Sequence, residues 1–414
     1  RLMEPSAGRM AFDGVDITHL SEAAMRPLRR HMQMIFQDPM SSLNPRLTVG
    51  RTIGAPLGVG RRDARVAEAL EQVGLPAGFA GRYPHELSGG QRQRVVIAIA
   101  CALKPKLLIA DEPTTALDVV LQKQILELLK DLVDEQKMGL LLISHDLAVV
   151  ADMADRVTIM RHGEVMEDGE TARTLTEQVH PYTRQLAQAS MHVPDRPHTT
   201  AASSTAANLL EIKNVSRDYP GRRVSLFRKG EPFRAVNDVS FSLKPGQSVA
   251  LVGRSGCGKS TLARMILALD RPTSGDIRFM GESLLGKDET ALRPFRRNMQ
   301  VVFQDPYGSF NPRHTVERLV AEPLHLLDAK PSPAARREMV ATALHEVGLK
   351  PSDMEKYPHE FSGGQRQRIS IARAIITRPK LIVADEPASA LDVSIRAQVL
   401  DLFADLNQRL GVPY

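Results

Sequence analysis

The sequence predicts an α/β fold present in two copies, and three observations support this expectation. A long repeat divides most of the chain into two similar halves, a glycine-rich loop joins an apolar run to a helix-like run, and two apolar runs end in paired acids. Such patterns predict strand–loop–helix units with right-handed crossovers. We therefore expect each half to hold a mostly parallel sheet, an antiparallel β portion and a helical subdomain.

The repeat consists of three segments that recur in the same order. The first recurs after 267 residues and the other two after 274, so the second copy carries seven more residues between the first and second segments. A period this long indicates a duplicated domain and not a solenoid. The segment pairs are Phe36–Val49 with Phe303–Val316, Tyr83–Arg94 with Tyr357–Arg368, and Leu107–Val119 with Leu381–Val393.

The repeat also sets the expected domain boundaries. The first copy should span residues 1–190 and the second residues 209–414, joined by a Ser-, Thr-, Ala- and Pro-rich linker at 191–208 that is typical of a flexible connection. The counterpart of Lys259 would lie before the first residue, and the counterpart of His145 would lie after Tyr414. We therefore expect a chain truncated at both ends, whose first copy lacks its phosphate loop and whose second copy lacks its terminal histidine.

Composition excludes several classes of protein. With 414 residues, 43% of them apolar, the chain can form two folded domains. Its longest wholly apolar run, Val95–Leu103, is too short for a membrane-spanning helix, which needs about 20 residues. Its two cysteines, Cys101 and Cys257, form neither a disulfide framework nor a zinc motif. The net charge of +6 alone does not separate a phosphate ligand, nucleic acid or a membrane surface.

The glycine-rich loop matches the pattern G-x-x-x-x-G-K-[ST]. It follows a strand-like run, Ser248–Val252, and opens a helix-like run, Thr261–Leu269, which is the context that a phosphate-binding loop requires. Its backbone amides and the helix N-terminus favour phosphate oxygens, with the lysine on the β- and γ-phosphates and the serine hydroxyl on Mg²⁺. The loop consists of Gly253, Arg254, Ser255, Gly256, Cys257, Gly258, Lys259, Ser260 and Thr261.

Two apolar runs end in adjacent acids, Asp111 and Glu112 in the first copy and Asp385 and Glu386 in the second. Such runs are typical of parallel strands covered on both faces, and acids at their carboxyl ends lie where α/β sheets bind ligands. The aspartates are candidate Mg²⁺ ligands, and the glutamates are candidate catalytic residues that orient the attacking water. A strand that merely ends in solvated acids is the alternative, and the repetition of the motif weighs against it.

Three further polar residues are candidates for the same site. Gln37 and Gln304 lie in the FQDP segments, where a neutral loop amide can reach Mg²⁺ or water, although each alone is compatible with a turn residue before Asp-Pro. His145 follows the strand-like run Leu140–Ile143, where it could contact a γ-phosphate or serve as a structural histidine.

The SGGQ stretches each precede a helix-like segment. Serine is a good N-cap, and two glycines expose the following amides, which together favour an anion site at a helix start, with an ordinary capped helix as the alternative. The residues are Ser88, Gly89, Gly90 and Gln91 in the first copy, and Ser362, Gly363, Gly364 and Gln365 in the second.

Together these residues resemble the nucleotide-binding domain of ABC transporters, a P-loop NTPase fold, over nearly the whole chain outside the linker. In this resemblance GRSGCGKST is the Walker A motif, the SGGQ stretches are the signatures, LLIADE and LIVADE are Walker B, and ATP and Mg²⁺ are the cofactors. Gln37 and Gln304 match the Q-loop, Asp118 and Asp392 the D-loop, and His145 the switch histidine. Tyr219 is placed like the aromatic residue that stacks on adenine, although the basic insertion Arg222–Arg234 separates it from the following strands.

Within that family the FQDP and YPHE segments and the tail His180–Gln185 resemble the dipeptide, oligopeptide, nickel and glutathione import ATPases. The resemblance implies an ATP-hydrolysing subunit that is peripheral on the cytoplasmic face of the inner membrane and energises two transmembrane permease subunits. An extracytoplasmic solute-binding protein would deliver the substrate to these permease subunits. The resemblance implies no nucleic-acid partner, and it does not identify the transported substrate. Members of the family with a cysteine cluster after this tail exist, and this chain has none there.

In the family the halves pair head to tail, so ATP on one Walker A is capped by the other half's signature. One site would combine Lys259 and its neighbours with Ser88, Gly90 and Gln91, and the other would combine Gln37, Asp111, Glu112 and His145 with Ser362–Gln365. Since each site lacks one part, we expect little coupled ATPase activity from this polypeptide, and a normal rate would contradict that expectation.

Two alternatives share these motifs. A soluble tandem ABC ATPase acting on ribosomes or DNA would carry zinc-binding CxxC pairs or a charged interdomain helix, and the sequence has neither. A fused exporter would need spanning segments, which this chain also lacks.

Overall fold

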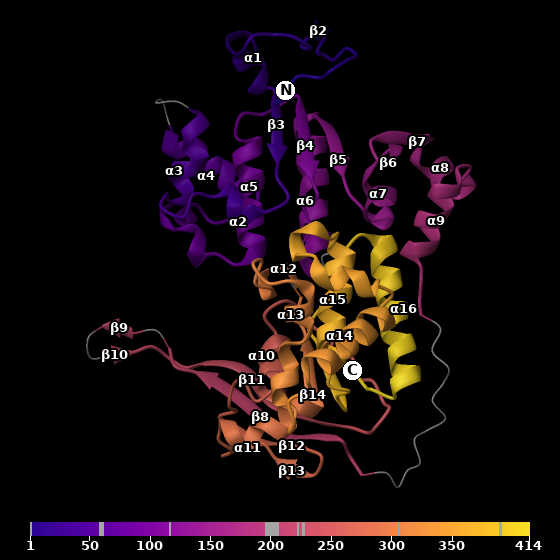
Figure 1. Ribbon diagram of the computed structural model, residues 1–414. Helices are drawn as coiled ribbons and strands as arrows, with labels where there is room; N and C mark the ends of the chain where they lie inside the picture. Colours follow the sequence, from indigo (N-terminus) through magenta and orange to yellow (C-terminus); the bar gives the residue numbers. More distant parts are fainter. Residues whose placement is uncertain are drawn as a thin grey trace. The chain divides into compact units, whose positions relative to one another are not determined.

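The computed structural model describes residues 2–57, 62–115, 117–194, 207–221, 223–225, 228–304, 306–388 and 391–414 (Figure 1). The chain divides into two compact units, residues 1–187 (unit 1) and 188–414 (unit 2). Most of the expected linker at 191–208 lies outside the described residues, as do Asp305 of the second FQDP segment, Ser389 and Ala390 beside Asp392, and part of the insertion Arg222–Arg234.

Unit 1 contains the parallel sheet that the sequence predicts. β4 (Leu107–Asp111) lies between β3 (Met32–Ile35) and β5 (Gly139–Ile143), and both neighbours run parallel to it. Its other elements are β1 (Ala11–Phe12), β2 (Val15–Asp16), α1 (Glu22–Arg29), α2 (Pro39–Ser42), α3 (Val49–Gly54), α4 (Arg62–Gln72), α5 (Gly89–Cys101), α6 (Val119–Gln136), α7 (Leu147–Met153), β6 (Arg156–Arg161), β7 (Glu164–Glu170), α8 (Thr171–Glu177) and α9 (Pro181–Ser190), whose end crosses into unit 2.

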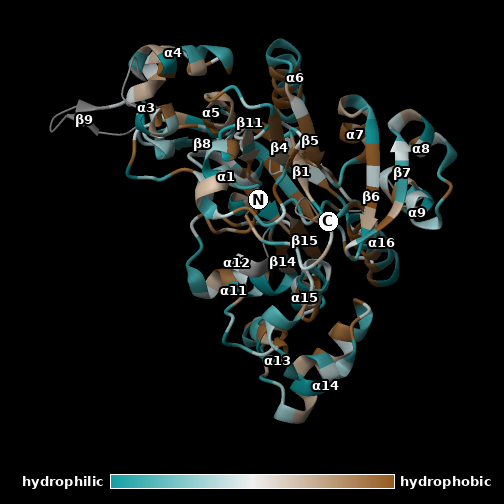
Figure 2. Ribbon diagram, turned by 90° about the horizontal axis from the view of Figure 1, so that it is seen from above, coloured by the Kyte–Doolittle hydropathy of each residue, from teal (hydrophilic) through white to brown (hydrophobic). Residues whose placement is uncertain are grey.

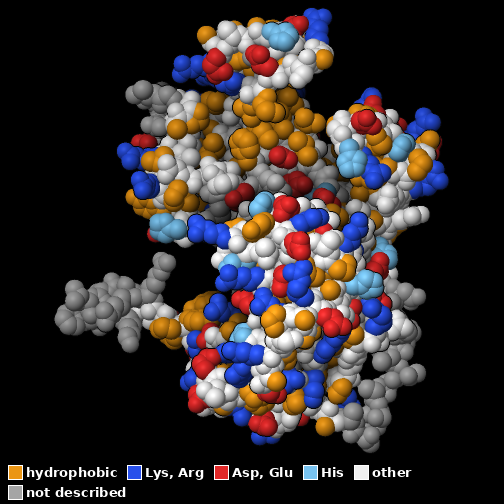
Figure 3. All heavy atoms as spheres, viewed as in Figure 1, with side chains coloured by type: hydrophobic (Ala, Val, Ile, Leu, Met, Phe, Trp, Pro, Cys, Tyr) orange, Lys and Arg blue, Asp and Glu red, His pale blue; other side chains and the backbone are white. Residues whose placement is uncertain are grey.

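The expectation that both faces of the Walker B strand are covered is wrong for unit 1. Leu108 and Ala110 are fully buried in the core cluster that includes residues of α5 and α6, whereas Leu107, Ile109 and Asp111 on the opposite face are only half-buried. On β5, Leu141 and Ile143 stay 52% and 44% exposed. Figure 3 shows the resulting hydrophobic patch over this sheet.

The described part of unit 2 has three sheets. The four-stranded antiparallel sheet has the order β11–β8–β12–β13, with β8 (Leu210–Tyr219), β11 (Phe233–Leu243), β12 (Ser274–Phe279) and β13 (Glu282–Ser283). The parallel sheet pairs β14 (Met299–Val302) with β15 (Leu381–Ala384), and a small antiparallel sheet pairs residues 223–225 with residues 228–229. Figure 2 shows β14 and β15 as mostly hydrophobic. The remaining elements are β9 (Arg223–Ser225), β10 (Arg228–Lys229), α10 (Lys259–Ile266), α11 (Glu289–Asn298), α12 (Pro306–Ser309), α13 (Val316–Val320), α14 (Pro333–Glu346), α15 (Gly363–Ile375) and α16 (Val393–Leu410).

In unit 2 a helix packs against the sheet face that is only half-buried on β4 of unit 1. Leu262, Met265 and Ile266 of α10 share a core cluster with Leu381 of β15, and Val383 packs against that cluster. These strand positions correspond to Leu107 and Ile109 through the 274-residue repeat. Leu381 is buried whereas Leu107 is half-buried, and Val383 and Ile109 are both half-buried. The burial of Leu381 therefore follows from the helix after the phosphate loop, which has no equivalent among the described residues of unit 1.

The strand expected at Ser248–Val252 does not form. Its residues carry no strand assignment, the amide of Val249 donates to the carbonyl of Tyr414 at 3.1 Å, and Leu251 and Val252 are 41% and 94% exposed. The neighbouring strand β15 receives its own bond from the same terminal segment, since Ile382 donates to the carbonyl of Pro413 at 3.0 Å. A strand requires a continuous ladder of such bonds, and this run does not complete one.

Both SGGQ stretches begin a helix in the same way. Ser88 is the N-cap of α5 and accepts from the amide of Gln91 at 3.3 Å, while the Gln91 side chain accepts from the amide of Ser88 at 3.0 Å. Ser362 and Gln365 repeat this capping box on α15, at 3.4 and 3.0 Å. The reciprocal bonds satisfy two backbone donors that would otherwise be unpaired at a helix start.

The second glycine of each signature is required by packing. Gly90 and Gly364 are buried, and a Cβ at Gly90 would lie 2.6 Å from the Leu121 side chain on α6. A Cβ at Gly364 would lie 2.4 Å from Cγ2 of Ile395 on α16. The expectation that both glycines expose amides therefore fits the exposed Gly89 and not its buried neighbour.

No described helix is both long enough and apolar enough to cross a membrane.

We predict that Gly364→Ala destabilises unit 2 by about 1–3 kcal/mol, because the new methyl group overpacks a core contact with a stiff β-branched side chain. Gly90→Ala should cost less, because the contacting Leu121 methyls can rotate away. Urea denaturation of each variant measures the effect. The matched control is Gly363→Ala, whose Cβ would have 3.7 Å to the nearest atom, Leu391 Cδ2; equal losses in Gly363→Ala and Gly364→Ala would refute the packing argument.

Candidate functional site

The phosphate loop of unit 2 is an exposed turn that leads directly into α10. Gly258 is the N-cap of α10 with φ of 99°, and a Cβ there would lie 2.3 Å from the carbonyl oxygen of Ala235. Only glycine satisfies both constraints. The Lys259 ammonium donates to the carbonyls of Gly253 and Arg254, at 2.7 and 3.1 Å, and so spans the loop. The loop thus holds a cation beside a helix N-terminus, which is suited to an anionic ligand.

The carboxyl ends of β14 and β15 bring the other predicted residues of unit 2 to the same place. Ser260 Oγ lies 3.3 Å from Asp385 Oδ1, and the Gln304 amide donates to Glu386 Oε2 at 3.0 Å. The pairing of Asp385 N–H with the Val302 carbonyl, at 3.0 Å, fixes the end of β15 against β14. Lys259, Asp385 and Glu386 also line one cavity of about 440 Å³.

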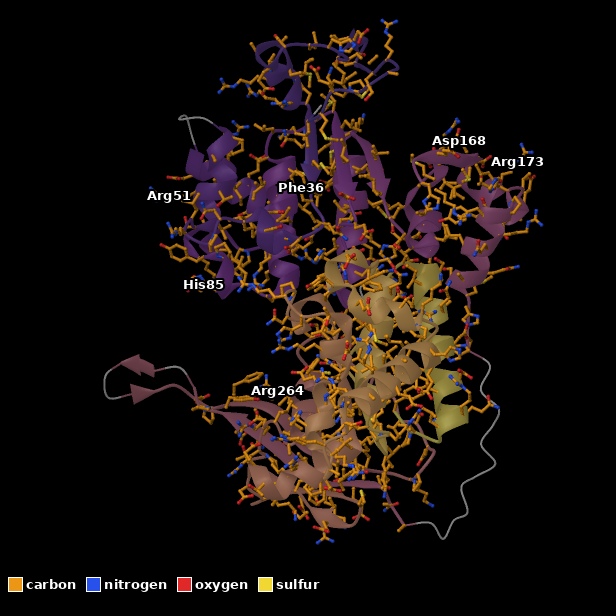
Figure 4. The ribbon with its side chains drawn as sticks, viewed as in Figure 1. Phe36, Arg51, His85, Asp168, Arg173 and Arg264 are labelled. Carbon is orange, nitrogen blue, oxygen red and sulfur yellow. The ribbon has the colours of Figure 1, made fainter. Side chains whose placement is uncertain are left out.

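Unit 1 gathers its predicted residues around Glu112. The Gln37 amide donates to Glu112 Oε2 at 2.7 Å, and His145 Nδ1 lies 3.0 Å from Glu112 Oε1. Figure 4 labels Phe36, which precedes Gln37 at the end of β3. Thr115 is a member of this cluster that the sequence analysis missed, since its hydroxyl donates to Glu112 Oε2 at 2.8 Å. The sequence feature that could have predicted this role is the position of Thr115, three residues after the glutamate and within the repeated segment.

These bonds determine the ionisation of Glu112. Burial alone would raise the pKa of Glu112, but hydrogen bonds from His145, Thr115 and Gln37, together with the charge of His145, outweigh burial and hold the pKa below its ordinary value. Because a carboxylate accepts these bonds, the proton in the His145–Glu112 contact belongs on Nδ1 of the imidazole. Glu112 is therefore a carboxylate at neutral pH, as a group that orients water must be.

Both glutamates sit in a strained backbone conformation. Glu112 has φ of 44° and Glu386 has φ of 46°, in the left-handed region that non-glycine residues rarely adopt. Such a conformation costs of order 1–3 kcal/mol and is retained where the surroundings impose it. Here it turns the glutamate side chain away from the strand direction and toward the glutamine amide.

Tyr219 contacts two side chains of unit 2, Asp270 and Arg217. Its hydroxyl donates to Asp270 Oδ2 at 2.7 Å, and the guanidinium of Arg217 lies over its ring, 4.6 Å from the centroid. Arg217 also pairs with Asp270 at 2.7 Å. Adenine stacking on Tyr219 therefore stays a prediction, and Arg217 already occupies one face of the ring.

Other expected residues keep local roles. Asp118 caps α6 by accepting from the Leu121 amide at 3.0 Å, and the rings of Tyr83 and His85 stack at 5.7 Å before α5. Among the described residues, no cluster of three or more His, Cys, Asp or Glu side chains could hold a metal ion by itself. A divalent cation would thus depend on oxygens such as those of Ser260 and Asp385 together with a ligand's own phosphates.

We predict that His145→Ala raises the pKa of Glu112, because it removes a hydrogen bond and a positive charge from the carboxylate. Because the pKa of Glu112 is lowered in the folded protein, its carboxylate stabilises the fold at pH values above 4.5, the ordinary pKa of a glutamate. That stability is lost as the pH falls from about 4.5 through the lowered pKa. Acid destabilisation below pH 4.5 should therefore be weaker in the variant. Carboxyl ¹³C NMR titration measures the pKa, with His162→Ala as the control; an unchanged Glu112 titration in His145→Ala would contradict the proposed bond.

Comparison with known proteins places this geometry in one family. The model of the ABC transporter family matches residues 1–115 and 236–389. The peptidoglycan transport ATP-binding protein YejF of Agrobacterium fabrum is 45% identical, over 99% of this chain and 76% of its own length. The glutathione import ATP-binding protein GsiA of Salmonella choleraesuis is 42% identical, over 97% of this chain and 69% of its own length. GsiA of Escherichia coli O157:H7 is 41% identical, over 100% of this chain and 73% of its own length.

Among solved structures, the dimeric bacterial ABC transporter cassette MJ0796 is 31% identical over 49% of this chain and 84% of its own, with a TM-score of 0.44. The assignment rests on the sequence matches, which extend over nearly the whole chain. The chain belongs to the ABC transporter ATP-binding proteins, a family of ATP-hydrolysing proteins.

Proposed function

We propose that this chain is the ATP-hydrolysing part of an importer for peptides or related small solutes such as glutathione. The observation that carries the proposal is the gathering of Lys259, Ser260, Gln304, Asp385 and Glu386 around the phosphate loop and the ends of β14 and β15. The names of the relatives, peptidoglycan transport and glutathione import ATP-binding proteins, support the transport role. Nothing in these comparisons favours the ribosome- or DNA-associated alternative.

Each residue of unit 2 would have a separate task in hydrolysis. The loop amides and Lys259 would hold the β- and γ-phosphates, and Ser260 and Asp385 would supply oxygen ligands for Mg²⁺, with Gln304 within reach of the same ion. Magnesium would neutralise charge that develops on the transferred phosphoryl group. Glu386, held by Gln304, would orient the attacking water and accept its proton.

The second site would use the cluster around Glu112. Gln37, Asp111 and His145 would take the corresponding positions there, with His145 near the γ-phosphate. We infer that the signatures close both sites in trans, Ser88, Gly90 and Gln91 on the Lys259 site and Ser362–Gln365 on the Glu112 site. The exposed Gly89 and Gly363 amides and the capped helix starts suit an anion at these positions.

Two transmembrane permease subunits and an extracytoplasmic solute-binding protein would complete the importer, with this chain peripheral on the cytoplasmic face of the inner membrane. Affinity purification of the full-length protein from detergent-solubilised membranes tests the assembly. Recovery of stoichiometric permease subunits supports the proposal. Recovery of ribosomal proteins or DNA-repair proteins in their place would overturn it.

We predict that Lys259→Ala weakens binding of a fluorescent ATP analogue at least tenfold, because it removes the cation that contacts two phosphates. Arg264→Gln is the matched control, since it removes a positive charge at the other end of the same helix, where Figure 4 labels it. Fluorescence titration measures both variants. Equal weakening in the two would mean that net charge, and not the loop lysine, controls binding.

We further predict that Glu386→Gln in the full-length protein keeps ATP binding while hydrolysis falls at least a hundredfold, because the isosteric amide cannot accept a proton from water. Single-turnover ATPase assays measure the rate. Gln398→Glu on α16 serves as a control for carboxyl–amide exchange elsewhere in the unit. Hydrolysis within tenfold of the unmodified rate in Glu386→Gln would remove this residue from the chemistry.

A further inference from the structure

Unit 2 contains a second cavity, separate from the loop and acids described above. Its volume is about 740 Å³, within the range of small-molecule sites in proteins. It is formed by α13, the short helix Glu322–Leu326, the segment after it and the first turn of α14. Figures 1 and 2 both show α13 and α14 side by side. None of the residues that line it is a candidate for the nucleotide site.

The lining is strongly basic. Arg318 on α13, Lys330 before α14 and Arg336 within α14 all line the cavity, together with His314 and His325. Among the described residues, no carboxylate forms an ion pair with Arg318, Lys330 or Arg336. Nε of Arg336 is, in addition, buried without a hydrogen-bond partner. The cavity therefore presents three cations that no described carboxylate neutralises.

The cavity's one acid does not neutralise these cations. Glu322 pairs with Arg373 on α15 at 3.6 Å, and Arg373 is only 11% exposed. The carboxylate thus serves a buried arginine that also packs over the Phe310 ring, 5.2 Å from its centroid. A nearby cation, Arg337, is likewise satisfied, because it pairs with Glu317 and Glu355 at 3.1 and 2.9 Å. The three cations of the cavity are therefore the ones left without a partner.

Part of the cavity lining is particular to the second copy. The seven additional residues of unit 2 fall between Leu324 and Val340, the segment that supplies His325, Lys330 and Pro331 to the lining. Through the repeat, His314 corresponds to Leu47 and Glu322 to Ala55, so the first copy lacks these polar groups. The insertion and these two polar groups are therefore particular to the second copy, whereas Arg318 and Arg336 have counterparts in Arg51 and Arg62.

We propose that this cavity binds a small molecule that carries two phosphate groups. Guanidinium groups bind phosphate through paired, charge-assisted hydrogen bonds, and a diphosphate concentrates enough negative charge in a small volume to satisfy three cations. Arg318 and Arg336 would hold the phosphates from α13 and α14, and Lys330 would supply the third charge. The ligand would join α14 and its preceding segment to α13, which follows the Gln304 loop.

Inorganic pyrophosphate is the probe that tests the site, titrated by calorimetry without Mg²⁺ into the Lys259→Ala protein so that the phosphate loop does not compete. We expect saturable binding, and an at least tenfold loss of affinity when Arg318→Gln and Arg336→Gln are added. The matched control adds Arg51→Gln and Arg62→Gln, the counterparts of those residues in the first copy, and should bind unchanged. Figure 4 labels Arg51 on α3 of unit 1.

Because the double variant removes two charges, circular dichroism accompanies each titration. If that variant unfolds, Lys330→Gln in the exposed segment replaces it, with an expected loss of about threefold. The absence of saturable pyrophosphate binding, or equal losses in the two double variants, would overturn the proposal. A third result would also overturn the proposal: the protein binds no pyrophosphate but sediments with phosphatidylglycerol vesicles, and this sedimentation is lost in the Arg318→Gln and Arg336→Gln variant. That result would assign the cavity to a lipid headgroup. The Lys259→Ala background makes each outcome independent of ATP hydrolysis.

Discussion

In both units a loop glutamine donates to the glutamate that follows a parallel strand, at 2.7 Å in unit 1 and 3.0 Å in unit 2. This bond joins the segment after β3 or β14 to the end of β4 or β15, and it holds a carboxylate whose own backbone is strained. The other groups of the site are arranged around it. His145 and Thr115 complete the hydrogen bonding of Glu112. In unit 2 Ser260 lies beside the neighbouring Asp385, and Lys259 lines the same cavity as that aspartate.

The two signatures depend on a different constraint. A capping box starts each helix, and the second glycine allows the first turn of the next long helix, α6 or α16, to pack against it. Because α6 and α16 begin just after β4 and β15, this packing also fixes the signature helices α5 and α15 relative to the strands that carry the acids. Within each unit the same packed elements therefore hold both the acids at the strand end and the start of the signature helix.

Much of this was predictable from the sequence, because phosphate loops, capping boxes and acid-ended strands are local patterns. The contacts of Gln37 and Gln304 with their glutamates needed the fold, since the partners are 75 and 82 residues apart. Strand formation at Ser248–Val252 and burial of both faces of β4 were predicted wrongly. Each depends on neighbours that pattern alone does not specify, a hydrogen-bonded ladder in one case and a covering helix in the other. The strain at Glu386 has no compositional signal.

We propose that the signature of one unit closes over the phosphate loop of the other, and native Cys257 allows a direct test of this proposal. Cys257 is exposed in the loop, whereas burial raises the pKa of Cys101 to about 12 and keeps that thiol unreactive. In full-length Ser88→Cys protein, a short thiol-specific cross-linker should join residues 88 and 257 in an ATP-dependent manner. Cross-linking that is independent of ATP, or that is stronger from Ser362→Cys in the same unit as the loop, would contradict the account.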